Sequence, residues 1–353
     1  MTPPPPDAGR EGTAGAAPAA DPEIAVSIIN YRTGAMTLRC VQSVVDDLAA
    51  GGTRGHVVVV DNASGDGSAE AIADWIAARP PAAAAAAPVT LIRAPVNGGF
   101  SGGHNRGLAS APARAAPATL VLNSDALLRP GFCAAILAAA ADDPGAGLLA
   151  PRLEDEDGTR QVSCFRVPGP VSELVRGAMT GPLTRLLDRW TVPMEMPPAP
   201  GAIGWASFAC ILLRREMVEA IGPMDEDYFL YFEDTEYCLR ARRAGWGIAY
   251  VEAARAVHLR GGSAPVKRLS KARKRLPGYY WASRARLMAQ AHGRAGLWAA
   301  NLAWLLGRGV AGLHRLAGRR VPPATEREGR DIWTGALTPL ARWRSGGPGM
   351  AGR

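Results

Sequence analysis

The chain has 353 residues, of which 48% are hydrophobic and 20% are charged. This composition is typical of a globular protein and excludes a chain that is disordered throughout. The net charge of +8 is unevenly spread, because the segment from Arg255 onwards holds 20 of the 40 Lys and Arg residues but only 3 of the 32 Asp and Glu residues. The sequence therefore predicts an acidic body with a basic tail. Such a tail suits a polyanion or an anionic membrane surface, and a solvated face is the alternative.

The N-terminal residues and the cysteines indicate the cellular compartment of the protein. Residues 1–22 are rich in proline and alanine and predict a disordered leader. They lack the apolar segment of a secretory signal. The five cysteines are widely spaced and form no CxxC pair, so neither a disulfide framework nor a zinc site is expected. We therefore expect a cytoplasmic protein.

From Ile24 onwards, short apolar strands alternate with amphipathic helices. The expected elements are strand IAVSIIN, a helix over 36–48, strand HVVVVD, a helix over 66–78, an alanine- and proline-rich surface insert over 80–88, strand VTLIR, a helix from about Gly102 and strand TLVLNSD. Strands that are apolar on both faces predict a mostly parallel sheet with helices on both sides. In such sheets the ligand lies beyond the carboxyl ends of the strands.

Polar residues gather at those carboxyl ends. Asp61 ends the second strand and is placed to accept hydrogen bonds from a base or ribose, whereas Asp125, on a tight turn, is a hard oxygen ligand suited to Mg²⁺ or Mn²⁺. Turn chemistry would explain any one such residue, but four strand ends in succession favour a site. The other polar residues at these ends are Asn30, Tyr31, Asn97 and Asn123.

The segment NGGFSGGHNRG is rich in glycine but lacks the GxGxxG spacing of dinucleotide-binding folds, and no P-loop motif occurs. Hydride transfer and P-loop chemistry are therefore disfavoured. We interpret the glycines as allowing the backbone to approach a ligand, with Asn105 facing it.

The segment FLYFEDTEYCLRARRAGW places Glu233 and Asp234 where a helix should start. Capping of that helix is one explanation, because carboxylates are favoured at helix N-termini. The aromatic residues before the pair favour another, in which a carboxylate in a partly dry cleft acts as a general base.

Taken in order, these segments carry a family resemblance. VSIINYRTG, VVVVDNASGDGS, NGGFSGGHNRGL, VLNSDALLRP, the span from Gly204 to Val251 and AVHLRGGS resemble the motifs of family 2 nucleotide-sugar glycosyltransferases, with the bacterial rhamnosyltransferase-like branch most similar. The likeness extends from Ile24 to Ser263. It implies a GT-A fold, α/β with a mostly parallel central sheet flanked by helices. The implied domains are a catalytic domain over 23–265, with a donor half over 23–150 and an acceptor half over 151–265, and a basic helical extension over 266–353.

The resemblance also implies roles for individual residues. Asp61 is similar to the aspartate that recognises the base, Asp125 and His258 to the ligands of a divalent ion, Mg²⁺ or Mn²⁺, and Asp234 to the general base, with Glu233 beside it. The metal turn has one carboxylate where many relatives have two. The residues implied for nucleotide-sugar binding are Asn30, Tyr31, Asn97, Asn105, Asn123 and Arg260, and those implied for the acceptor pocket are Trp205, Ser207 and Phe208.

The implied function is inverting transfer of a sugar, such as rhamnose, from a dTDP- or UDP-sugar to a hydroxyl of a cell-surface polysaccharide or lipid-linked glycan. A non-catalytic nucleotide-sugar or glycan binding module on the same fold, recruited to the membrane by its basic tail, is the alternative. Intact Asp61, Asp125, Asp234 and His258 favour the enzyme, since a degenerate copy would be free to lose them.

Two segments leave alternatives open. Residues 161–200 are either a mobile acceptor lid or a plain surface insert. Residues 296–317 form an apolar stripe interrupted by Arg308, His314 and Arg315, which predicts a helix in the headgroup region on the cytoplasmic face of the inner membrane rather than a spanning helix. Ordinary packing against the catalytic domain is the alternative. Nucleic acid is not expected as a partner, because the basic stretch has no recognisable reading motif.

Overall fold

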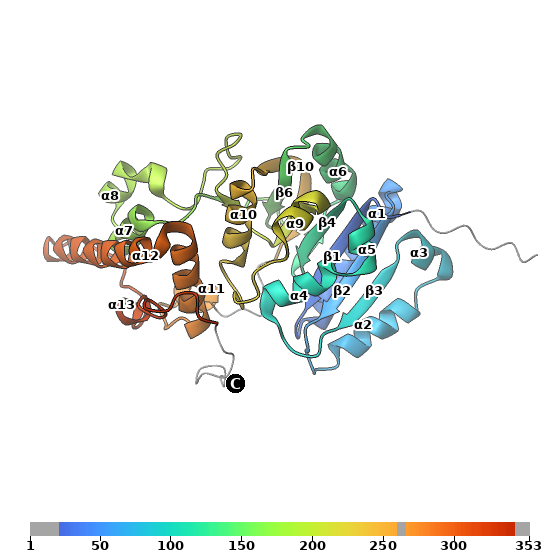
Figure 1. Cartoon of the computed structure of the whole chain (residues 1–353), viewed down its shortest axis with the longest axis horizontal. Coiled ribbons are helices and arrows are strands. Elements are labelled where there is room, and N and C mark those ends of the chain that lie inside the picture. Colours follow the sequence, from blue (N-terminus) through green and yellow to red (C-terminus); the bar gives the residue numbers. More distant parts are fainter. Residues whose placement is uncertain (1–20, 260–265, 343–353) are drawn as a thin grey trace, which may run out of the picture.

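One mixed sheet of eight strands forms the centre of the protein, in the order β3-β2-β1-β4-β9-β6-β10-β5. The computed structural model describes residues 21–259 and 266–342 (Figure 1), so the leader expected over 1–22 lies almost wholly outside the described residues. The strands are β1 (Ile24–Asn30), β2 (Gly55–Asp61), β3 (Val89–Arg93), β4 (Ala118–Asn123), β5 (Ala126–Leu128), β6 (Ala146–Glu154), β9 (Cys210–Arg214) and β10 (Gly247–His258), with a separate pair β7 (Cys164–Phe165) and β8 (Trp205–Ala206).

The expectation of a mostly parallel sheet is confirmed in the N-terminal half. Strand β1 lies parallel to β2 and to β4, and β2 lies parallel to β3. The exceptions are β9, which enters antiparallel between β4 and β6, and β5, which pairs antiparallel with β10. The parallel strands place their carboxyl ends at one edge of the sheet, so that the polar residues following β1, β2 and β4 meet there.

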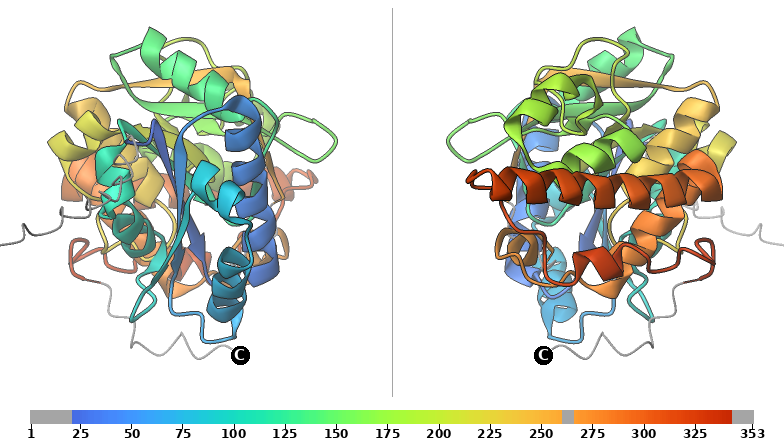
Figure 2. Two further views of the ribbon diagram at one scale, coloured as in Figure 1. Left: turned by 90° about the vertical axis from the view of Figure 1, so that its right-hand side faces the viewer. Right: turned by 90° about the vertical axis from the view of Figure 1, so that its left-hand side faces the viewer.

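Helices cover both faces of the sheet (Figure 2). Alternate residues of β4 show the two layers, since Leu120 and Leu122 belong to a core with α1 and α6, whereas Val121 belongs to a core with α9 and α10. The helices are α1 (Gly34–Gly51), α2 (Ser68–Ala77), α3 (Pro81–Ala86), α4 (Gly99–Leu108), α5 (Ala111–Ala115), α6 (Phe132–Asp142), α7 (Pro170–Ala178), α8 (Gly181–Leu186), α9 (Arg215–Ile221), α10 (Glu233–Arg243), α11 (Val266–Lys271), α12 (Gly278–Leu316) and α13 (Glu328–Asp331), with a 3₁₀ turn at Asp188–Trp190.

The insert expected over 80–88 lies at the surface and contains the short helix α3, none of whose residues is buried. Its five consecutive alanines have the highest helix propensity of any residue, and Pro81 occupies the first helical position, where a missing N–H costs nothing.

The C-terminal segment packs against the rest of the protein through one face of α12. This helix runs for 39 residues with a bend at Gly293, whose φ of 72° is not helical. Trp281, Leu297 and Trp304 are buried. Figure 2 shows α12 lying across one end of the molecule beside α7. Of the two alternatives for residues 296–317, packing against the catalytic domain therefore holds for one face of the helix.

A buried ion-pair network joins α7 to the C-terminal segment. Arg284, which is 2% exposed, donates to Glu173 Oε2 at 2.8 Å and to Asn301 Oδ1 at 2.8 Å. Arg176 pairs with both Glu173 and Glu328. Burial alone would raise the pKa of Glu173, but the two guanidinium groups outweigh it and lower the pKa to about 2. These contacts fix α7 in place, which disagrees with a mobile lid for that part of 161–200.

We predict that Glu173→Gln destabilises the protein by roughly 3 to 5 kcal/mol, because it leaves the buried Arg284 without its counter-charge. Because the pKa of Glu173 is lower in the folded state, the stabilisation that its ionised carboxylate provides is present above pH 4.5, the ordinary glutamate value. It is lost as the pH falls towards 2. Urea denaturation at pH 7 measures the change. Glu70→Gln is the control, since Glu70 and its partner Arg93 are 63% and 51% exposed at their side chains. Equal stabilities for the two variants would contradict the prediction.

Candidate active site

Strands β1 and β2 end in a hydrogen-bonded cluster around Asp61. Asn30 Nδ2 donates to Asp61 Oδ1 at 2.7 Å and to Ser68 Oγ at 2.7 Å. Ser64 donates to both carboxylate oxygens of Asp61, through Oγ at 2.6 Å and through its backbone N–H at 3.2 Å. Asp61 is 5% exposed. The cluster therefore holds this carboxylate in one orientation at the carboxyl edge of the sheet, as expected for recognition of a ligand's donor groups.

The loop after β3 is fixed by Asn62. Its Nδ2 donates to Asn97 Oδ1 at 2.9 Å and to the Gly99 carbonyl at 2.8 Å, while its Oδ1 accepts from the Gly98 N–H at 3.1 Å. Gly99 has a φ of +69°, and a Cβ there would lie 2.0 Å from the Phe229 carbonyl oxygen. Only glycine permits this approach, which brings the loop after β3 against the aromatic segment that precedes the acidic pair.

The acidic pair begins α10 after two residues in left-handed conformation. Tyr231 and Phe232 have φ values of 72° and 71°, which are costly for aromatic residues. Strain of this kind is concentrated at functional sites. Glu233 is 6% exposed, and its Oε2 has no hydrogen-bond partner among the described residues. Asp234 Oδ1 accepts from the Thr235 N–H at 2.7 Å.

The two carboxyl groups have unusual protonation behaviour. Burial, together with the negative charge of Asp234, raises the pKa of Glu233 well above its ordinary value. Burial raises the pKa of Asp234 to about 6, against hydrogen bonds from Thr235 and the Phe208 backbone that lower it. The pair therefore carries a carboxylate that is both ionised and proton-accepting near neutral pH, as a general base requires.

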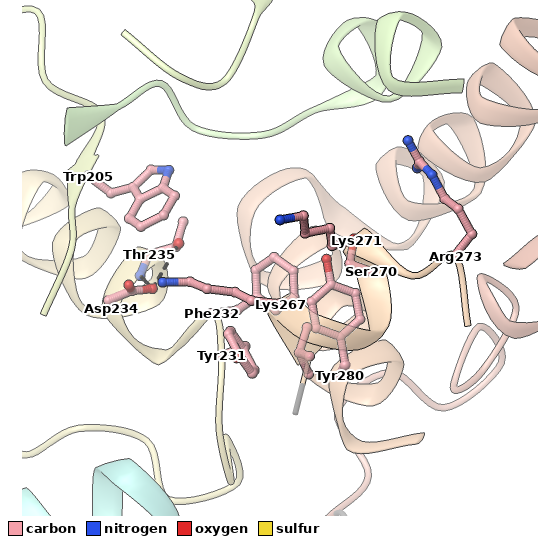
Figure 3. A pocket seen from close by; sticks show the side chains of 11 residues that line it. Trp205, Tyr231, Phe232, Asp234, Thr235, Lys267, Ser270, Lys271, Arg273 and Tyr280 are labelled. Carbon is pink, nitrogen blue, oxygen red and sulfur yellow. Dashed lines mark hydrogen bonds between the residues drawn. The ribbon is translucent and has the colours of Figure 1, made fainter. Parts of the chain in front are cut away.

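Asp234 faces a cavity of about 570 Å³ (Figure 3). Trp205 forms one wall, where its ring stacks on Phe165 with a centroid distance of 4.1 Å and its Nε1 donates to the Arg166 carbonyl at 3.0 Å. The remaining lining residues come from the acidic-pair segment, α11 and the residues that follow it, and are Tyr231, Phe232, Thr235, Val266, Lys267, Ser270, Lys271, Arg273 and Tyr280.

At the end of β4, Asp125 and His258 converge. His258 Nε2 lies 3.6 Å from Asp125 Oδ1, and the two residues are 8% and 5% exposed. Oxygen and imidazole nitrogen are both ligands of Mn²⁺, and Mg²⁺ also binds through one or two carboxylates with substrate phosphates completing the sphere. Among the described residues, no group of three or more His, Cys, Asp or Glu side chains could hold a metal. The pair fits a divalent ion whose remaining ligands would come from outside these two side chains.

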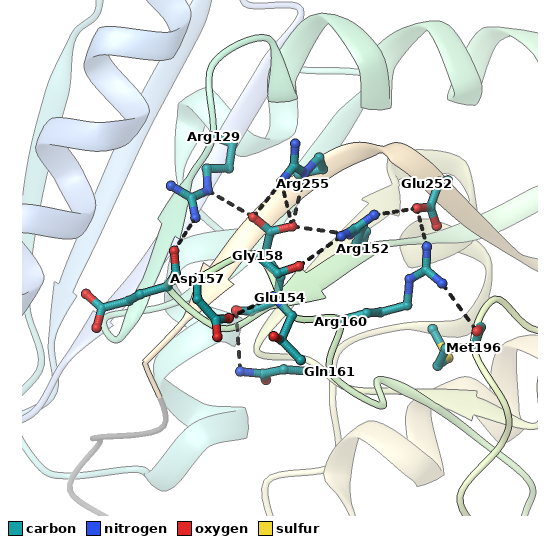
Figure 4. A network of polar contacts seen from close by, with 12 residues as sticks. Arg129, Arg152, Glu154, Asp157, Gly158, Arg160, Gln161, Met196, Glu252 and Arg255 are labelled. Carbon is teal, nitrogen blue, oxygen red and sulfur yellow. Dashed lines mark hydrogen bonds and ion pairs between the residues drawn. The ribbon is translucent and has the colours of Figure 1, made fainter.

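A network of arginines fixes the strands that carry His258 (Figure 4). Glu154, which is fully buried, accepts from Arg129 at 3.0 Å and from Arg255 at 3.0 Å, and it pairs with Arg152 at 3.2 Å. Gln161 Nε2 donates to the His258 carbonyl at 2.8 Å. The backbone of His258 is therefore held by Gln161, a residue outside the AVHLRGGS segment.

Short connections link the metal turn to the acidic pair. Ser124 and Thr33 share a hydrogen bond at 3.1 Å, which ties the turn to the loop after β1. The Asn123 N–H donates to the Ala209 carbonyl at 2.9 Å. The next residue back, Phe208, hydrogen-bonds to Asp234 through its backbone. Phe208 and Ala209, the two residues just before β9, therefore link the turn that carries Asp125 to the acidic pair.

Some expected site residues have other positions. Phe208 is 2% exposed and packs edge-on against Tyr237, so its side chain does not line the acceptor cavity. Asn105 joins α4 to the segment before the acidic pair, since it donates to the Met224 carbonyl at 2.9 Å and accepts from the Met224 N–H at 2.9 Å. Ser207 Oγ accepts from the Ala209 N–H at 3.3 Å. Arg260 lies outside the described residues.

Comparison with known proteins agrees with this architecture. Residues 22–277 match the family model described as glycosyltransferase like family 2. The chain is 31% identical over 267 residues, 71% of this chain and 79% of the relative, to the N-acetylglucosaminyl-diphospho-decaprenol L-rhamnosyltransferase of Mycobacterium tuberculosis. It is 26% identical over 163 residues, 46% of this chain and 49% of the relative, to the low-salt glycan biosynthesis hexosyltransferase of Haloferax volcanii.

Among solved structures, the mannosyltransferase PcManGT from Pyrobaculum calidifontis, in complex with GDP-Man and Mn²⁺, is similar in fold, with a TM-score of 0.51 at 16% identity over 86% of this chain and 78% of that one. The fold is the GT-A fold of glycosyltransferases. This chain belongs to glycosyltransferase family 2.

We predict that Asp234→Asn raises the stability of the protein at pH 8 by about 1 to 3 kcal/mol, because each unit of pKa shift corresponds to roughly 1.4 kcal/mol. Its pKa is raised from 3.8 to about 6 on folding, so the folded state binds the proton more tightly and ionisation costs stability. The difference between variant and wild type should narrow as the pH falls from 8 towards 4, and melting temperatures across this range measure it. A difference that does not change with pH would show that the buried charge of Asp234 is not its cause.

Proposed function

We propose that the chain is a metal-dependent inverting glycosyltransferase. It moves a hexosyl-type sugar, such as rhamnose, from a dTDP- or UDP-sugar to a hydroxyl of a cell-envelope polysaccharide or lipid-linked glycan. The observation that carries the proposal is the placement of Asp234, whose pKa is about 6, on a cavity, together with the backbone hydrogen bonds of Phe208 and Ala209 that link it to Asn123, two residues before Asp125.

In the proposed donor site, Asp61 accepts from the base of the nucleotide, and Asn30 and the Asn62–Asn97 pair keep its pocket in shape. Tyr31 lies next to this pocket in the chain, with the Arg32 guanidinium 5.3 Å from its ring centroid. Asn123 and Asp125 then face the diphosphate. Asn105 has a positioning role instead, because its amide is engaged by Met224.

The reaction needs one proton to be removed and one charge to be neutralised. Asp234 takes the proton of the acceptor hydroxyl as the oxygen bonds to the anomeric carbon, while the bond to the nucleoside diphosphate breaks on the opposite face and the configuration inverts. Asp125 and His258 would hold Mg²⁺ or Mn²⁺, which neutralises the developing charge of the leaving diphosphate. Glu233, whose pKa burial raises, stays protonated and leaves the negative charge of the pair on Asp234.

The relatives support the sugar and the acceptor class in this proposal. The mycobacterial relative is named for transfer of L-rhamnose to a diphosphate-linked decaprenol acceptor, and the Haloferax relative for glycan biosynthesis. The solved mannosyltransferase contains GDP-Man and Mn²⁺. These names favour a nucleotide-sugar donor, a divalent metal and a lipid-linked acceptor for this chain as well.

Two variants test the proposal by separating chemistry from donor binding. Asp234→Asn should lower turnover by roughly 10²- to 10⁴-fold, the range for loss of a general base, while nucleotide binding stays within about twofold of wild type. Asp125→Asn should weaken both turnover and Mn²⁺-dependent binding of nucleoside diphosphates. Isothermal titration with UDP, dTDP and GDP in Mn²⁺, and again in EDTA, measures binding.

The non-catalytic alternative predicts a different pattern. A binding module would bind nucleotide sugar, and no transfer would be found with any donor in the wild-type chain. Transfer in wild type that persists at full rate in Asp234→Asn would remove this residue from the base role, and binding indifferent to EDTA would remove Asp125 from the metal role.

We also propose that the outer face of α12 lies against an anionic membrane, peripheral on its cytoplasmic face. Five leucines and Trp298 remain exposed along this helix, from 39% for Leu305 to 87% for Leu316. Arg315 and the arginines after the helix supply positive charge next to them. Among the described residues, no helix has both the length and the apolar character needed to cross a bilayer.

The double change Leu306→Ser/Leu313→Ser should weaken flotation with vesicles containing phosphatidylglycerol by at least about tenfold, because each buried leucine contributes roughly 1.5 to 3 kcal/mol. These side chains are 68% and 67% exposed, so the fold should be unaffected. Val96→Ser, on the loop between β3 and α4, is the matched control with an exposed fraction of 61%. Equal flotation of wild type, the double variant and the control variant would contradict membrane contact by α12.

A further inference from the structure

The loop over 222–232 joins α9 to α10 and leads directly into the acidic pair. It ends in Tyr231 and Phe232, the two aromatic residues in left-handed conformation. Backbone strain of this kind persists only where the surrounding contacts hold it. One such contact comes from the donor half, where the Phe100 N–H donates to the Phe229 carbonyl at 2.9 Å. Further contacts come from α12, a helix that the proposed chemistry does not use.

Arg286 of α12 bridges two carboxylates of this loop. Its Nε donates to Asp225 Oδ2 at 2.9 Å, and its Nη2 donates to Asp227 Oδ2 at 2.8 Å. The arginine side chain is 12% exposed and those of the two aspartates are 22% and 24% exposed, so the ion pairs are partly buried. Burial would raise the pKa of Asp225, but the Asp227 N–H and the Arg286 guanidinium lower it. A planar guanidinium that binds two carboxylates at once fixes their relative position.

Gln290, one helical turn further along α12, holds the middle of the loop. Its Oε1 accepts from the Tyr228 hydroxyl at 2.6 Å, and its Nε2 donates to Asp225 Oδ2 at 3.3 Å. Tyr228 is fully buried, and the Arg286 guanidinium lies 5.7 Å from its ring centroid. Because a buried hydroxyl that lacks a partner is costly, this hydrogen bond ties Tyr228 to α12.

The first turn of α12 packs on the strained residues themselves. The Tyr280 ring centroid lies 5.8 Å from that of Tyr231 and 5.2 Å from that of Phe232. The Tyr279 ring centroid lies 5.8 Å from that of Phe229. Figure 3 shows Tyr280 beside Phe232 at the cavity that Asp234 faces. The contacts from α12 therefore extend from the start of the loop to its strained end.

We propose that Arg286 is a positioning residue for the base of the reaction. By bridging Asp225 and Asp227 it holds the loop against α12, and the loop in turn keeps Asp234 buried and oriented towards the cavity. This inference rests on the proposed function. It adds to that function a residue from outside the family match, which ends at residue 277, just before α12 begins.

The surroundings of Asp234 allow a positioning effect to be distinguished from a direct effect of charge. The titratable groups facing it include Glu233 beside it, Tyr231 before the helix, Cys238 one turn along α10, and Lys267, whose side chain points towards the carboxylate from α11 (Figure 3). Loss of a nearby cation would raise the pKa of Asp234, because a cation favours the ionised form. Release of the loop into water would lower this pKa instead, because burial is the main cause of its raised value.

Four proteins test the proposal, namely wild type, Asp234→Asn, Arg286→Gln and the double variant. The stability advantage of Asp234→Asn over the protein with Asp234 grows with pH until the folded-state carboxyl ionises, near pH 6, and then levels off. In the Arg286→Gln background this levelling point should move at least about 1 pH unit towards 3.8, as melting temperatures between pH 4 and 8 measure. An unmoved point would leave Arg286 a structural role only, and a point at higher pH would indicate a direct charge effect. Either result overturns the proposal.

Arg294→Gln is the matched control. Arg294 is an exposed cation of the same helix, and in the described part of the chain it donates to the Leu337 carbonyl rather than to the loop. Its loss should leave the levelling point of wild type unchanged. An equal shift in this variant would overturn the proposal, since the effect would then be one of net charge.

The neutral change Gln290→Ala keeps the test decisive where Arg286→Gln does not fold. It removes the partner of the Tyr228 hydroxyl without altering any charge, so a shift in the levelling point can come only from the position of the loop. Combined with Asp234→Asn in the same way, it should move the levelling point in the same direction. A levelling point that stays at the wild-type pH in Gln290→Ala would contradict the role of this contact surface.

Nucleotide binding separates this inference from the proposed function. Arg286→Gln should bind UDP or dTDP in Mn²⁺ within about twofold of wild type, because the proposed donor residues follow β1, β2 and β4, away from the loop. Turnover should fall by roughly 10- to 100-fold, the effect of a small misplacement of a reacting group. A chain that binds no nucleotide and transfers no sugar fails as a glycosyltransferase whatever the pH result. A chain that transfers sugar, with an unmoved levelling point in Arg286→Gln, fails only in the positioning role.

Discussion

The organisation of the active-site side depends on keeping two adjacent carboxyl groups, Glu233 and Asp234, out of water at the start of α10. Their burial raises both pKa values and costs folding free energy, so the surrounding structure must hold the segment against its own tendency to expose them. Two left-handed aromatic residues precede the pair, and the contact of Gly99 with Phe229 fixes the backbone before them. The strain and the charge burial belong to the same few residues, and this concentration is typical of a catalytic site.

Most of the donor half could be predicted from the hydrophobic pattern and from the residues at the strand ends. Valines on both faces of β2 require a covered sheet, and in a parallel sheet the residues after β1, β2 and β4 must meet at one edge, so the meeting of Asn30, Asp61 and Asp125 could be predicted. The positioning residues could not. Gln161 reaches the His258 carbonyl from a loop 97 residues away in sequence. Asn62 looks like any turn asparagine until its three partners in the loop after β3 are known.

The acceptor half was harder because its cavity combines segments with no common pattern. Phe208 was expected in the acceptor pocket because of the family resemblance around Trp205, yet it lies in the turn between β8 and β9 and its ring packs in the core against Tyr237. The basic segment before α12 was interpreted only through its charge, as a tail for a polyanion or a membrane. Its place on the cavity of Asp234 depends on α12 turning back over α7, a contact that a buried glutamate and two arginines stabilise and that no local signal indicates.

The C-terminal segment is therefore part of the proposed site as well as a surface for a membrane. One face of α12 packs through Trp281 and Trp304, and the residues just before it, with α11, line the cavity opposite Asp234. The outer face presents leucines to solvent. Helix α12, with its bend at Gly293, thus joins the proposed acceptor cavity to the proposed membrane face. An acceptor whose phosphate is attached to lipid could remain in the bilayer at one end while its sugar reaches the base at the other, and the helix would set the distance between them.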